Sequence, residues 1–507
     1  MNTAIIKNNT CIPVANIPVM EYEVFAEVVT HLLADKNNHC VAYYGYRLDA
    51  ENLKFICAIA KDNRGDIVML SYELDTTQTT RIDSICPGSL TLQMYEREIA
   101  ENFGIEFFGH PWAKPVRYAW NRADKDKVLQ NYPFYRIDGN QLHEVGVGPI
   151  HAGVIEPGHF RFLCHGEEVL HLEIQLGYQH RGVENLYLTK KSLLQRTVLS
   201  ESIAGDTVSG HALAFCGVTE SLAGFEPDEQ LSLLRGLSLE LERIAVHVGD
   251  LSAFCTDVAY QLGAAVFGAL RTPMINYGQL WCGNRFNKGL IRPGYNPWAY
   301  TIELRDKLNS VLDDFEMKYR EMADEMFSLD TVQSRYEKTG DVTREQMEMI
   351  GAVGMAARIT GIPRDIRASH PFGSYKTLKY IPELQQGGDV WARGMLRHDE
   401  ILSSIKYVRD LLDKLDLSSE VVRAVQPRVH KLEFKPNMFS ISLTEGWRGE
   451  ICHSAITDEN GEIIHYKVKD PSFHNWLALA LAVRNQEISD FPICNKSYDL
   501  SYCGFDL

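Results

Sequence analysis

Hydrophobic positions in the first 125 residues follow first a helical and then a strand-like spacing. Apolar side chains recur every three to four positions over residues 21–36, which predicts an amphipathic helix. These positions are Phe25, Val28, Val29, Leu32 and Leu33. Residues 55–60 and 67–74 are rich in β-branched and aromatic side chains and flank a polar turn, so we expect a hairpin. A second helix over 94–103 completes a small α+β unit.

The remainder of the chain has a different pattern, and a polar stretch at 126–142 is the expected linker. Residues 143–507 would then form a second, larger unit. It opens with a glycine-rich, β-favouring stretch at 145–176 and continues with long apolar stripes of helical period, at 304–322 and 401–415. A β-hairpin is expected at 450–469. The fold class is therefore α+β, with a small first domain and a large, mainly helical second domain that begins with a sheet.

Composition and charge exclude several classes of function. The 507 residues include 45% hydrophobic and 23% charged side chains, as in an ordinary folded protein. A net charge of −16 disfavours nucleic acid as a partner, because a polyphosphate would be repelled. Uncharged runs such as 8–20 are shorter than the ~20 apolar residues that a membrane span needs. The 11 cysteines are scattered, which is typical of reduced, mostly buried thiols.

Two clusters combine glycine, proline or helical spacing with titratable side chains. His151, Glu156 and His159 lie in a Gly/Pro-rich stretch and could relay protons, although composition alone favours a loop with hydrogen-bonded histidines. Glu240, Arg243 and His247 share one face of a helix. That face would be either a buried polar network or a solvent-exposed surface, and the high free energy of burying charges favours the exposed surface.

Two further clusters are equally open. Arg358, Asp365 and Arg367 lie in a turn-prone, charge-dense stretch that would either line an ionic cavity or form a solvated loop. Cys494 and Cys503 are nine positions apart, a spacing that matches no zinc or iron–sulfur motif, so two unrelated thiols are expected.

Longer stretches resemble a known family. Residues 95–111 (YEREIAENFGIEFFGHP) resemble the signature of the 30-kDa subunit of respiratory complex I. Residues 148–151 (GPIH) and 177–184 (GYQHRGVE) resemble the opening of the 49-kDa subunit, which is homologous to the large subunit of membrane-bound nickel–iron hydrogenases. The fused chain is similar to the large subunit of formate hydrogenlyase and hydrogenase-4 type complexes. The resemblance implies a 30-kDa-like domain over 1–125 and a 49-kDa-like domain over 143–507.

The sequence departs from the hydrogenases where nickel is bound. In that family, four thiolates hold the metal, and the corresponding positions here are Ala204, Thr207, Ser501 and Gly504. Alanine and glycine offer no ligand atom, and hydroxyls are poor substitutes for soft thiolates. The resemblance therefore implies that this chain has no nickel–iron centre. His211, which follows the first pair in the hydrogenase pattern, is retained.

The quinone site of the 49-kDa subunit is also only partly matched. The tyrosine of that subunit aligns with Gly205, and its quinone-loop histidine aligns with Pro157, with His159 nearby. Glu156 resembles the glutamate that serves as a proton gate in hydrogenases. If a quinone binds, His159, Gly205 and Thr207 are the residues expected to contact it.

The resemblance implies a subunit of the peripheral arm of a membrane-associated oxidoreductase complex, on the cytoplasmic side of the membrane. Electrons would come from an iron–sulfur cluster in a partner small subunit of the complex I 20-kDa type, with a ferredoxin-like subunit as a further candidate partner. Antiporter-like and other membrane subunits would translocate ions. Glu156 and His151 would pass protons near His211, while Arg358, Asp365 and Arg367 would set the charge of the cavity.

Two alternatives stay open at this point. The chain could be a non-catalytic scaffold that couples its neighbours, which the loss of both thiol pairs favours. It could also be a hydrogen-evolving subunit, but this would require nickel to bind without the family's thiolates. A ligand-sized cavity between residues 148–156, 204–211 and the C-terminal tail would favour the redox function, whereas a tightly packed tail would favour the scaffold.

Overall fold

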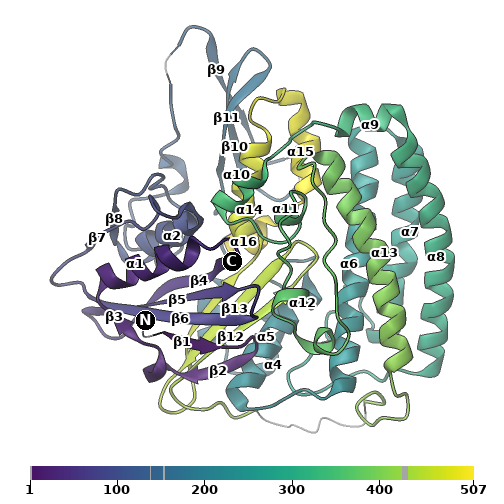
Figure 1. Ribbon diagram of the computed structural model, residues 1–507, viewed down its shortest axis with the longest axis horizontal. Helices are drawn as coiled ribbons and strands as arrows, with labels where there is room; N and C mark the ends of the chain where they lie inside the picture. The colour runs from purple at the N-terminus through teal and green to yellow at the C-terminus, as the bar shows by residue number, and fades with distance from the viewer. Residues whose placement is uncertain (1–2, 138, 152–154, 425–431) are drawn as a thin grey trace.

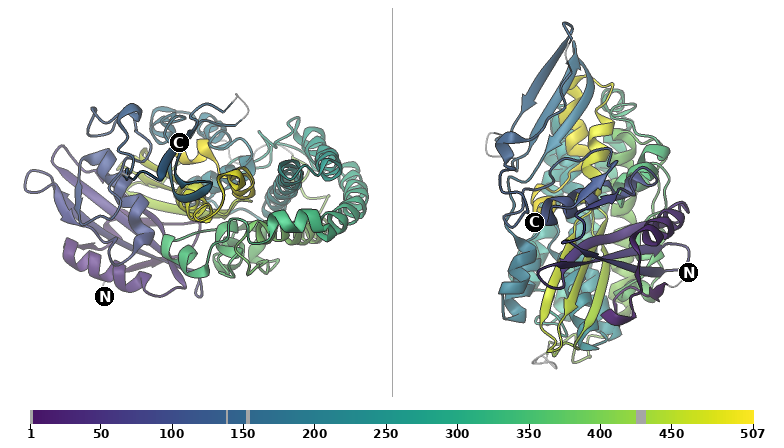
Figure 2. Two further views of the ribbon diagram at one scale, coloured as in Figure 1. Left: turned by 90° about the horizontal axis from the view of Figure 1, so that it is seen from above. Right: turned by 90° about the vertical axis from the view of Figure 1, so that its left-hand side faces the viewer.

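The computed structural model describes residues 3–137, 139–151, 155–424 and 432–507. A sheet-rich N-terminal part stands on one side and a group of long helices on the other, with the C-terminal sheet between them (Figure 1). Seen from above, the long helices remain at one end of the molecule, away from the N-terminal sheet (Figure 2).

The N-terminal sheet has the strand order β1-β6-β5-β4, and β3 pairs with β6 in parallel. These strands are β1 (Ala4–Ile6), β3 (Val19–Met20), β4 (Asn38–Arg47), β5 (Asn52–Lys61) and β6 (Asp66–Asp75). Helices α1 (Tyr22–Leu33) and α2 (Gln93–Phe103) pack on it. Phe25 of α1 lies 4.6 Å from the ring of Tyr72, so the predicted apolar stripe does face the sheet. The expected helices and the β5–β6 hairpin are confirmed.

One strand of the N-terminal part belongs to another sheet, which the sequence pattern did not indicate. Strand β2 (Thr10–Pro13) pairs with β12 (Met438–Glu445), giving the order β14-β13-β12-β2 with β13 (Glu450–Thr457) and β14 (Ile463–Lys469). Asn8 fixes the crossing: its side-chain amide donates to the carbonyls of His370 and Leu443, each at 2.9 Å. The predicted 450–469 hairpin is confirmed as β13 and β14.

The large domain adds a three-stranded sheet and a bundle of long helices. The sheet has the order β11-β10-β9, from β9 (Leu142–Val147), β10 (His159–His165) and β11 (Glu168–Gln175). The long helices are α6 (Glu229–Asp257), α7 (Gln261–Cys282), α8 (Ile302–Ser328) and α13 (Val390–Lys414). The side chains of Asp228, Thr301 and Asp389 cap α6, α8 and α13 by accepting a backbone N–H at their N-termini. The two predicted apolar stripes are buried within α8 and α13.

Shorter elements connect these parts. They are β7 (Arg81–Asp83), β8 (Glu106–Phe108), α3 (Val183–Thr189), α4 (Leu193–Ser200), α5 (Val208–Ala223), α9 (Asp330–Tyr336), α10 (Arg344–Ile350), α11 (Met355–Arg358), α12 (Ile366–Ser369), α14 (Ser472–Ala482), α15 (Phe491–Tyr498) and α16 (Tyr502–Asp506). Helix α5 packs on β12 and β13, which brings its N-terminus to the turn between these strands. In the described part of the chain, every helix is too short or too polar to cross a membrane.

Candidate functional site

The first thiol-aligned segment meets the second at the start of α5. We call this region the tail junction: residues 204–211, the C-terminal residues 499–507, Arg448 from the turn between β12 and β13, and Asp470 after β14. Each piece comes from a different part of the chain, so only the tertiary fold assembles it.

Arg448 holds the two segments together. Its Nη1 and Nη2 atoms donate to the carboxylate of Asp206 at 2.6 and 2.7 Å, and Nη1 also donates to Thr207 Oγ1 at 3.2 Å. Its Nε atom donates to the backbone carbonyl of Asp499 on the tail side. The guanidinium also stacks over Trp447, 3.9 Å from the ring centre. A buried cation therefore lies between the two segments.

A chain of hydrogen bonds runs from the junction into the sheet. His211 Nε2 lies 3.1 Å from Asp470 Oδ2, His211 Nδ1 lies 3.1 Å from His453 Nε2, and His453 Nδ1 lies 2.8 Å from the hydroxyl of Tyr466. Asp470 accepts the Nε2 proton of His211, and in the neutral tautomer that donates from Nε2 the Nδ1 atom of this ring is an acceptor. His453 must then donate from Nε2 and accept from Tyr466. All three donors point toward Asp470, as a proton relay requires.

The electrostatics of this chain agree with that assignment. Burial, with His211 adding to it, lowers the pKa of His453 well below its usual value, so the ring is neutral. Burial opposes ionisation of Asp470, but the hydrogen bond from His211 and the nearby Arg448 keep the pKa of the carboxyl below its usual value. The chain therefore ends on an ionised carboxylate that accepts a hydrogen bond from His211.

The thiol-aligned positions do not fit a nickel–iron centre. Ala204 and Gly504 carry no donor atom, and a Cβ atom at residue 504 would lie only 2.7 Å from the carboxylate of Asp470. The hydroxyl of Ser501 accepts the backbone N–H of Gly504, and Thr207 is bonded to Arg448. A site with no thiolate at these positions and a guanidinium already present is unsuited to a soft, positively charged metal centre.

The 148–159 loop reaches the tail from the other side, with residues 152–154 outside the described part of the chain. His151 bonds the carbonyl of Gly158 at 2.8 Å and His159 bonds that of Gly148 at 3.1 Å, so both histidines hold the loop's own backbone. Glu156 instead faces the tail and hydrogen-bonds with the thiol of Cys503. Burial and Glu156 raise the pKa of this thiol to about 11, so it is protonated and able to donate.

Arg358, Asp365 and Arg367 lie in a separate, fully buried ionic cluster. Its remaining charged members are Glu240, Arg243, Glu400 and Glu445. Arg358 bonds Glu400 at 2.6 Å and Glu445 at 2.7 Å, and Arg367 bonds Asp365 at 2.7 Å. Neither an ionic cavity nor a solvated loop describes this stretch, because the charges are packed against one another.

The expectation of an exposed face for Glu240, Arg243 and His247 is wrong. All three are fully buried, because α6 packs against α13 and Arg243 reaches backbone carbonyls at the end of β12, and each charge has a partner there. Four carboxyls face three arginines in the cluster, and burial with the neighbouring Asp365 raises the pKa of Glu445 to about 7. A proton on Glu445 balances the charges.

Three buried acids near the junction have raised pKa values and were not singled out from the sequence. Glu242 accepts the backbone N–H of Ser209 at 2.7 Å, and burial raises the pKa of Glu242 to about 8. Burial and the adjacent carboxyl of Asp499 raise the pKa of Asp250 well above its usual value. Burial raises the pKa of Asp506 to about 6. These residues resemble ordinary helix or tail positions in the sequence, and only the density of acids around 240–250 was a signal.

Cavities at the junction are small. One of about 20 Å³ lies beside Asp206 and Glu242, and another of about 10 Å³ lies beside Arg448 and Tyr498. Each has room for roughly one water molecule. In contrast, Gly205 is exposed and a Cβ atom there would meet open space, so the junction opens to the surface at that residue.

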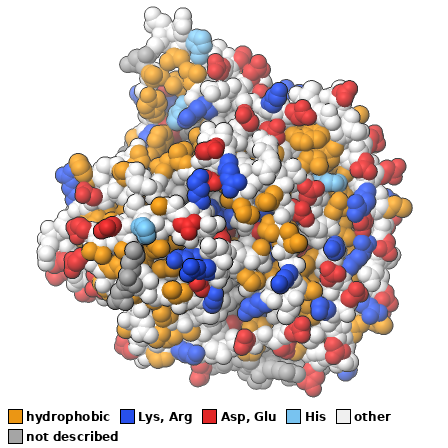
Figure 3. Space-filling model, in the orientation of Figure 1, with side chains coloured by type: hydrophobic (Ala, Val, Ile, Leu, Met, Phe, Trp, Pro, Cys, Tyr) orange, Lys and Arg blue, Asp and Glu red, His pale blue; other side chains and the backbone are white. Residues whose placement is uncertain are grey.

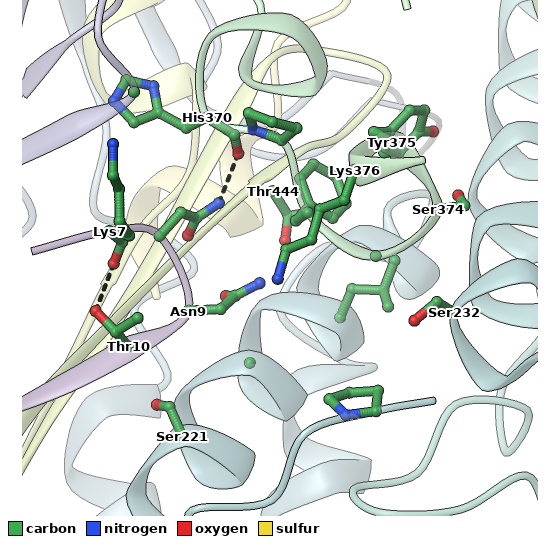
Figure 4. A pocket seen from close by; sticks show the side chains of 18 of the residues that line it. Lys7, Asn9, Thr10, Ser221, Ser232, His370, Ser374, Tyr375, Lys376 and Thr444 are labelled. Atoms are coloured by element: carbon green, nitrogen blue, oxygen red, sulfur yellow. Dashed lines mark hydrogen bonds between the residues drawn. The ribbon is translucent and has the colours of Figure 1, made fainter. Parts of the chain in front are cut away.

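A much larger cleft of about 1050 Å³ lies elsewhere, between the β1–β2 turn, the start of α6 and residues 368–377. Lys7, Asn9, Ser232 and Lys376 surround it (Figure 4). Its walls contain none of the sequence-predicted site residues among those described. On the face shown in Figure 3, acidic and basic side chains are interspersed, so that face has no continuous basic surface.

Comparisons with known proteins identify the family. Residues 19–125 match the family model of the respiratory-chain NADH dehydrogenase 30-kDa subunit, and residues 264–506 match that of the 49-kDa subunit. These two matches confirm the resemblance to both subunits: the 95–111 stretch lies within the first match, whereas the 148–151 and 177–184 stretches lie before the second.

Relatives cover most of the chain. Hydrogenase-4 component G of Escherichia coli (strain K12) is 25% identical, covering 93% of this chain and 81% of the relative. One NADH-quinone oxidoreductase subunit of Phocaeicola vulgatus is 24% identical, covering 89% and 91%. A solved chain of the membrane-bound sulfane sulfur reductase, an archaeal respiratory membrane complex, shares the fold with a TM-score of 0.67 at 19% identity, over 74% of this chain and all of that chain. The protein is therefore a fusion of 30-kDa and 49-kDa domains of the complex I type, related to subunits of membrane-bound hydrogenases and NADH-quinone oxidoreductases.

Proposed function

We propose that this chain is a nickel-free subunit of a membrane-associated oxidoreductase complex. It would couple electron transfer from a partner iron–sulfur subunit to proton movement, on the cytoplasmic side of a membrane in which other subunits translocate ions. The single observation that carries the proposal is the position of Arg448, which is bonded between the two segments that hold the metal in the hydrogenase pattern.

The chain's own residues supply groups around that position that hold or hydrogen-bond protons. Asp470 and His211 begin the relay toward Tyr466, and Glu242 carries a proton at neutral pH. A change in charge near Arg448 would shift the proton affinity of these groups, because Coulomb interactions are strong in a poorly solvated interior. Reduction of a cofactor at the junction would then draw protons inward.

The acceptor in this proposal is a quinone or another small molecule bound where Gly205 opens to the surface. The cavity would be completed by the partner subunit, because the small cavities at the junction do not admit a ligand of that size. Thr207 and Gly205 would face the acceptor, with Glu156 and the Cys503 thiol at the loop side.

A second candidate is the scaffold without chemistry of its own. It is favoured by the close packing of the tail: Gly504 has no room for a side chain, and Asp506 accepts backbone N–H groups of Gly177 and Gln179 at 2.7 Å each. In this function, the junction would couple conformational changes between neighbouring subunits, and its acidic residues would only stabilise the fold.

Elemental analysis of the intact complex tests the proposal. The complex would be purified from membranes by a tag on this chain, and nickel and iron would be counted per copy. Iron without nickel, together with quinone reduction, is the expected result. One nickel per copy would refute the account of Ala204, Thr207, Ser501 and Gly504. Iron without any measurable electron transfer would favour the scaffold.

Substitution of Glu156 tests the proton path. Glu156→Gln should lower turnover of the complex about tenfold or more, since positioned acid–base groups contribute ~10²–10⁴-fold to catalysis. Assembly should be unchanged, because the amide can still accept the thiol hydrogen bond. Glu144→Gln, at an exposed position of β9, the strand that precedes the loop of Glu156, is the matched control. Equal turnover of both variants would remove Glu156 from the path.

A further inference from the structure

A second, mostly apolar pocket lies where the two domains meet. It has a volume of about 280 Å³ and is bounded by α2, the 111–116 segment, β11 and α14. Aromatic side chains form much of its wall, namely Trp112, Tyr132, Phe473, Trp476 and Phe505. The sequence-predicted site residues do not line it, so it is distinct from the tail junction.

Size and shape limit what the pocket can hold. An engineered apolar cavity of roughly 150 Å³ binds benzene, and this pocket has nearly twice that volume. A bicyclic ring system therefore matches the space. Aromatic walls favour a planar ligand, because rings stack on one another with a gain of about 0.5–1.5 kcal/mol beyond the area buried.

Two buried polar atoms in the wall have no hydrogen-bond partner among the described residues. They are Nε1 of Trp476 and Nε2 of His171. Trp476 is only 5% exposed, so its N–H has little access to water from outside. An indole nitrogen can only donate, and a buried donor without an acceptor is costly. A ligand that carries an acceptor oxygen would satisfy it.

The charges around the pocket favour an anion. Arg97 and Arg484 line it with one acid, Glu173, whose carboxylate is paired with Lys114 outside the lining. Arg97 donates to the backbone carbonyls of Lys114 and Pro115 at 2.7 and 2.8 Å. In the described chain, no carboxylate lies within ion-pair distance of Arg97 or Arg484. These two cations thus lie beside an apolar space without a direct ion pair, although the charges of Glu101 and Glu173 act on Arg97 from farther away.

We infer that this pocket binds a planar, bicyclic aromatic carboxylate. The ring would stack between Trp112, Trp476 and Phe505, while the carboxylate would face the arginines and accept from the indole N–H. Phe505 belongs to α16 and precedes Asp506, which anchors the tail to residues 177–179. Ligand binding should therefore stabilise the tail helix as well as the pocket, without itself carrying electrons.

Binding of 2-naphthoate to the full chain, purified with its partner subunits, tests the inference. Titration calorimetry should give a saturable site, and 2-naphthamide, its uncharged counterpart, should bind about tenfold more weakly. Hydrogen exchange of α14 and α16 should slow when 2-naphthoate binds. No binding up to about 1 mM, or equal binding of the amide, would overturn the inference.

Variants locate the site. Ala480→Phe places a ring in the cavity and should abolish binding, whereas Arg484→Gln, at an exposed position, should weaken it about threefold to tenfold without affecting the fold. Arg320→Gln removes the same charge on the far α8 and should leave binding unchanged. If Ala480→Phe does not fold, binding to Arg484→Gln and the hydrogen-exchange data still test whether 2-naphthoate binds in this pocket. Undiminished binding to Arg484→Gln, with no slower exchange in α14, would place the ligand elsewhere.

Discussion

Replacing Arg448 should loosen the C-terminal tail while the rest of the molecule stays folded. In Arg448→Met, the apolar stem can still stack on Trp447, but the guanidinium bonds to Asp206, Thr207 and Asp499 are lost. Removing one partner of a buried ion pair typically costs ~3–5 kcal/mol. The carboxylates here keep 35% and 40% of their surface exposed, so water recovers part of that energy. We expect a loss of about 3 kcal/mol, at the low end of the range.

Hydrogen exchange of α16 measures this loss locally. Since ~1.4 kcal/mol corresponds to a factor of ten, the opening of the tail should become about a hundredfold more frequent. Arg448→Lys keeps the charge but loses the paired guanidinium donors. The opening frequency of its tail should therefore lie between that of the unmodified protein and that of Arg448→Met. Arg409→Gln, which removes exposed ion pairs on α13, is the control and should leave α16 unchanged. If α16 in Arg448→Met exchanges as slowly as in the unmodified protein, Arg448 does not hold the junction and the reasoning is refuted.

The remaining predictions concern a buried proton and the contact between the domains. Glu242, with its pKa raised to about 8, binds a proton that the unfolded chain releases above ~4.3, so stability should fall by up to about 1.4 kcal/mol per pH unit between these values. Glu242→Gln should flatten that slope in urea unfolding measured across pH, while the exposed Glu229→Gln should not; an unchanged slope would mean that Glu242 is ionised when folded. Asn8→Ala leaves the backbone N–H of Leu443 without its side-chain acceptor and should cost about 2–3 kcal/mol, seen as faster exchange in β12. Asn63→Ala, in a nearby exposed turn, should leave the stability unchanged. If both variants lose the same stability, Asn8 does not fix the crossing of the chain from β1 to β2.

Most of the long helices and the hairpins could be predicted from the periodic pattern of hydrophobic residues. Apolar stripes such as those of α8 and α13 identify long helices, because a packed helix needs one continuous apolar face. Strand β2 was missed, because Thr10–Pro13 is too short to show a period and its partner lies in β12. A pairing between such distant residues leaves no local signal in either segment.

The site was predicted less completely, for a related reason. The thiol-aligned segments and His211 could be found because the resemblance supplied their positions. Arg448 and Asp470 could not, since an isolated Arg or Asp is indistinguishable from a surface residue until folding places it against its partners. Glu240 and Arg243 were wrongly predicted to be exposed. The free energy of burying each charge is offset by opposite charges from α12 and α13, which the local sequence does not show.

The pairing of β2 with β12 has a consequence for how the chain folds and how it can be divided. The Asn8–Leu443 contact closes a loop of 435 residues, so the C-terminal sheet cannot be completed until almost the whole chain has been synthesised. Such distant contacts slow folding, because chain entropy is lost before the contact forms. Separating the two domains into two polypeptides after β3 would leave the β12 edge to be covered by a strand from another molecule. Expressed alone, the large domain should therefore aggregate or recruit the N-terminal segment in trans.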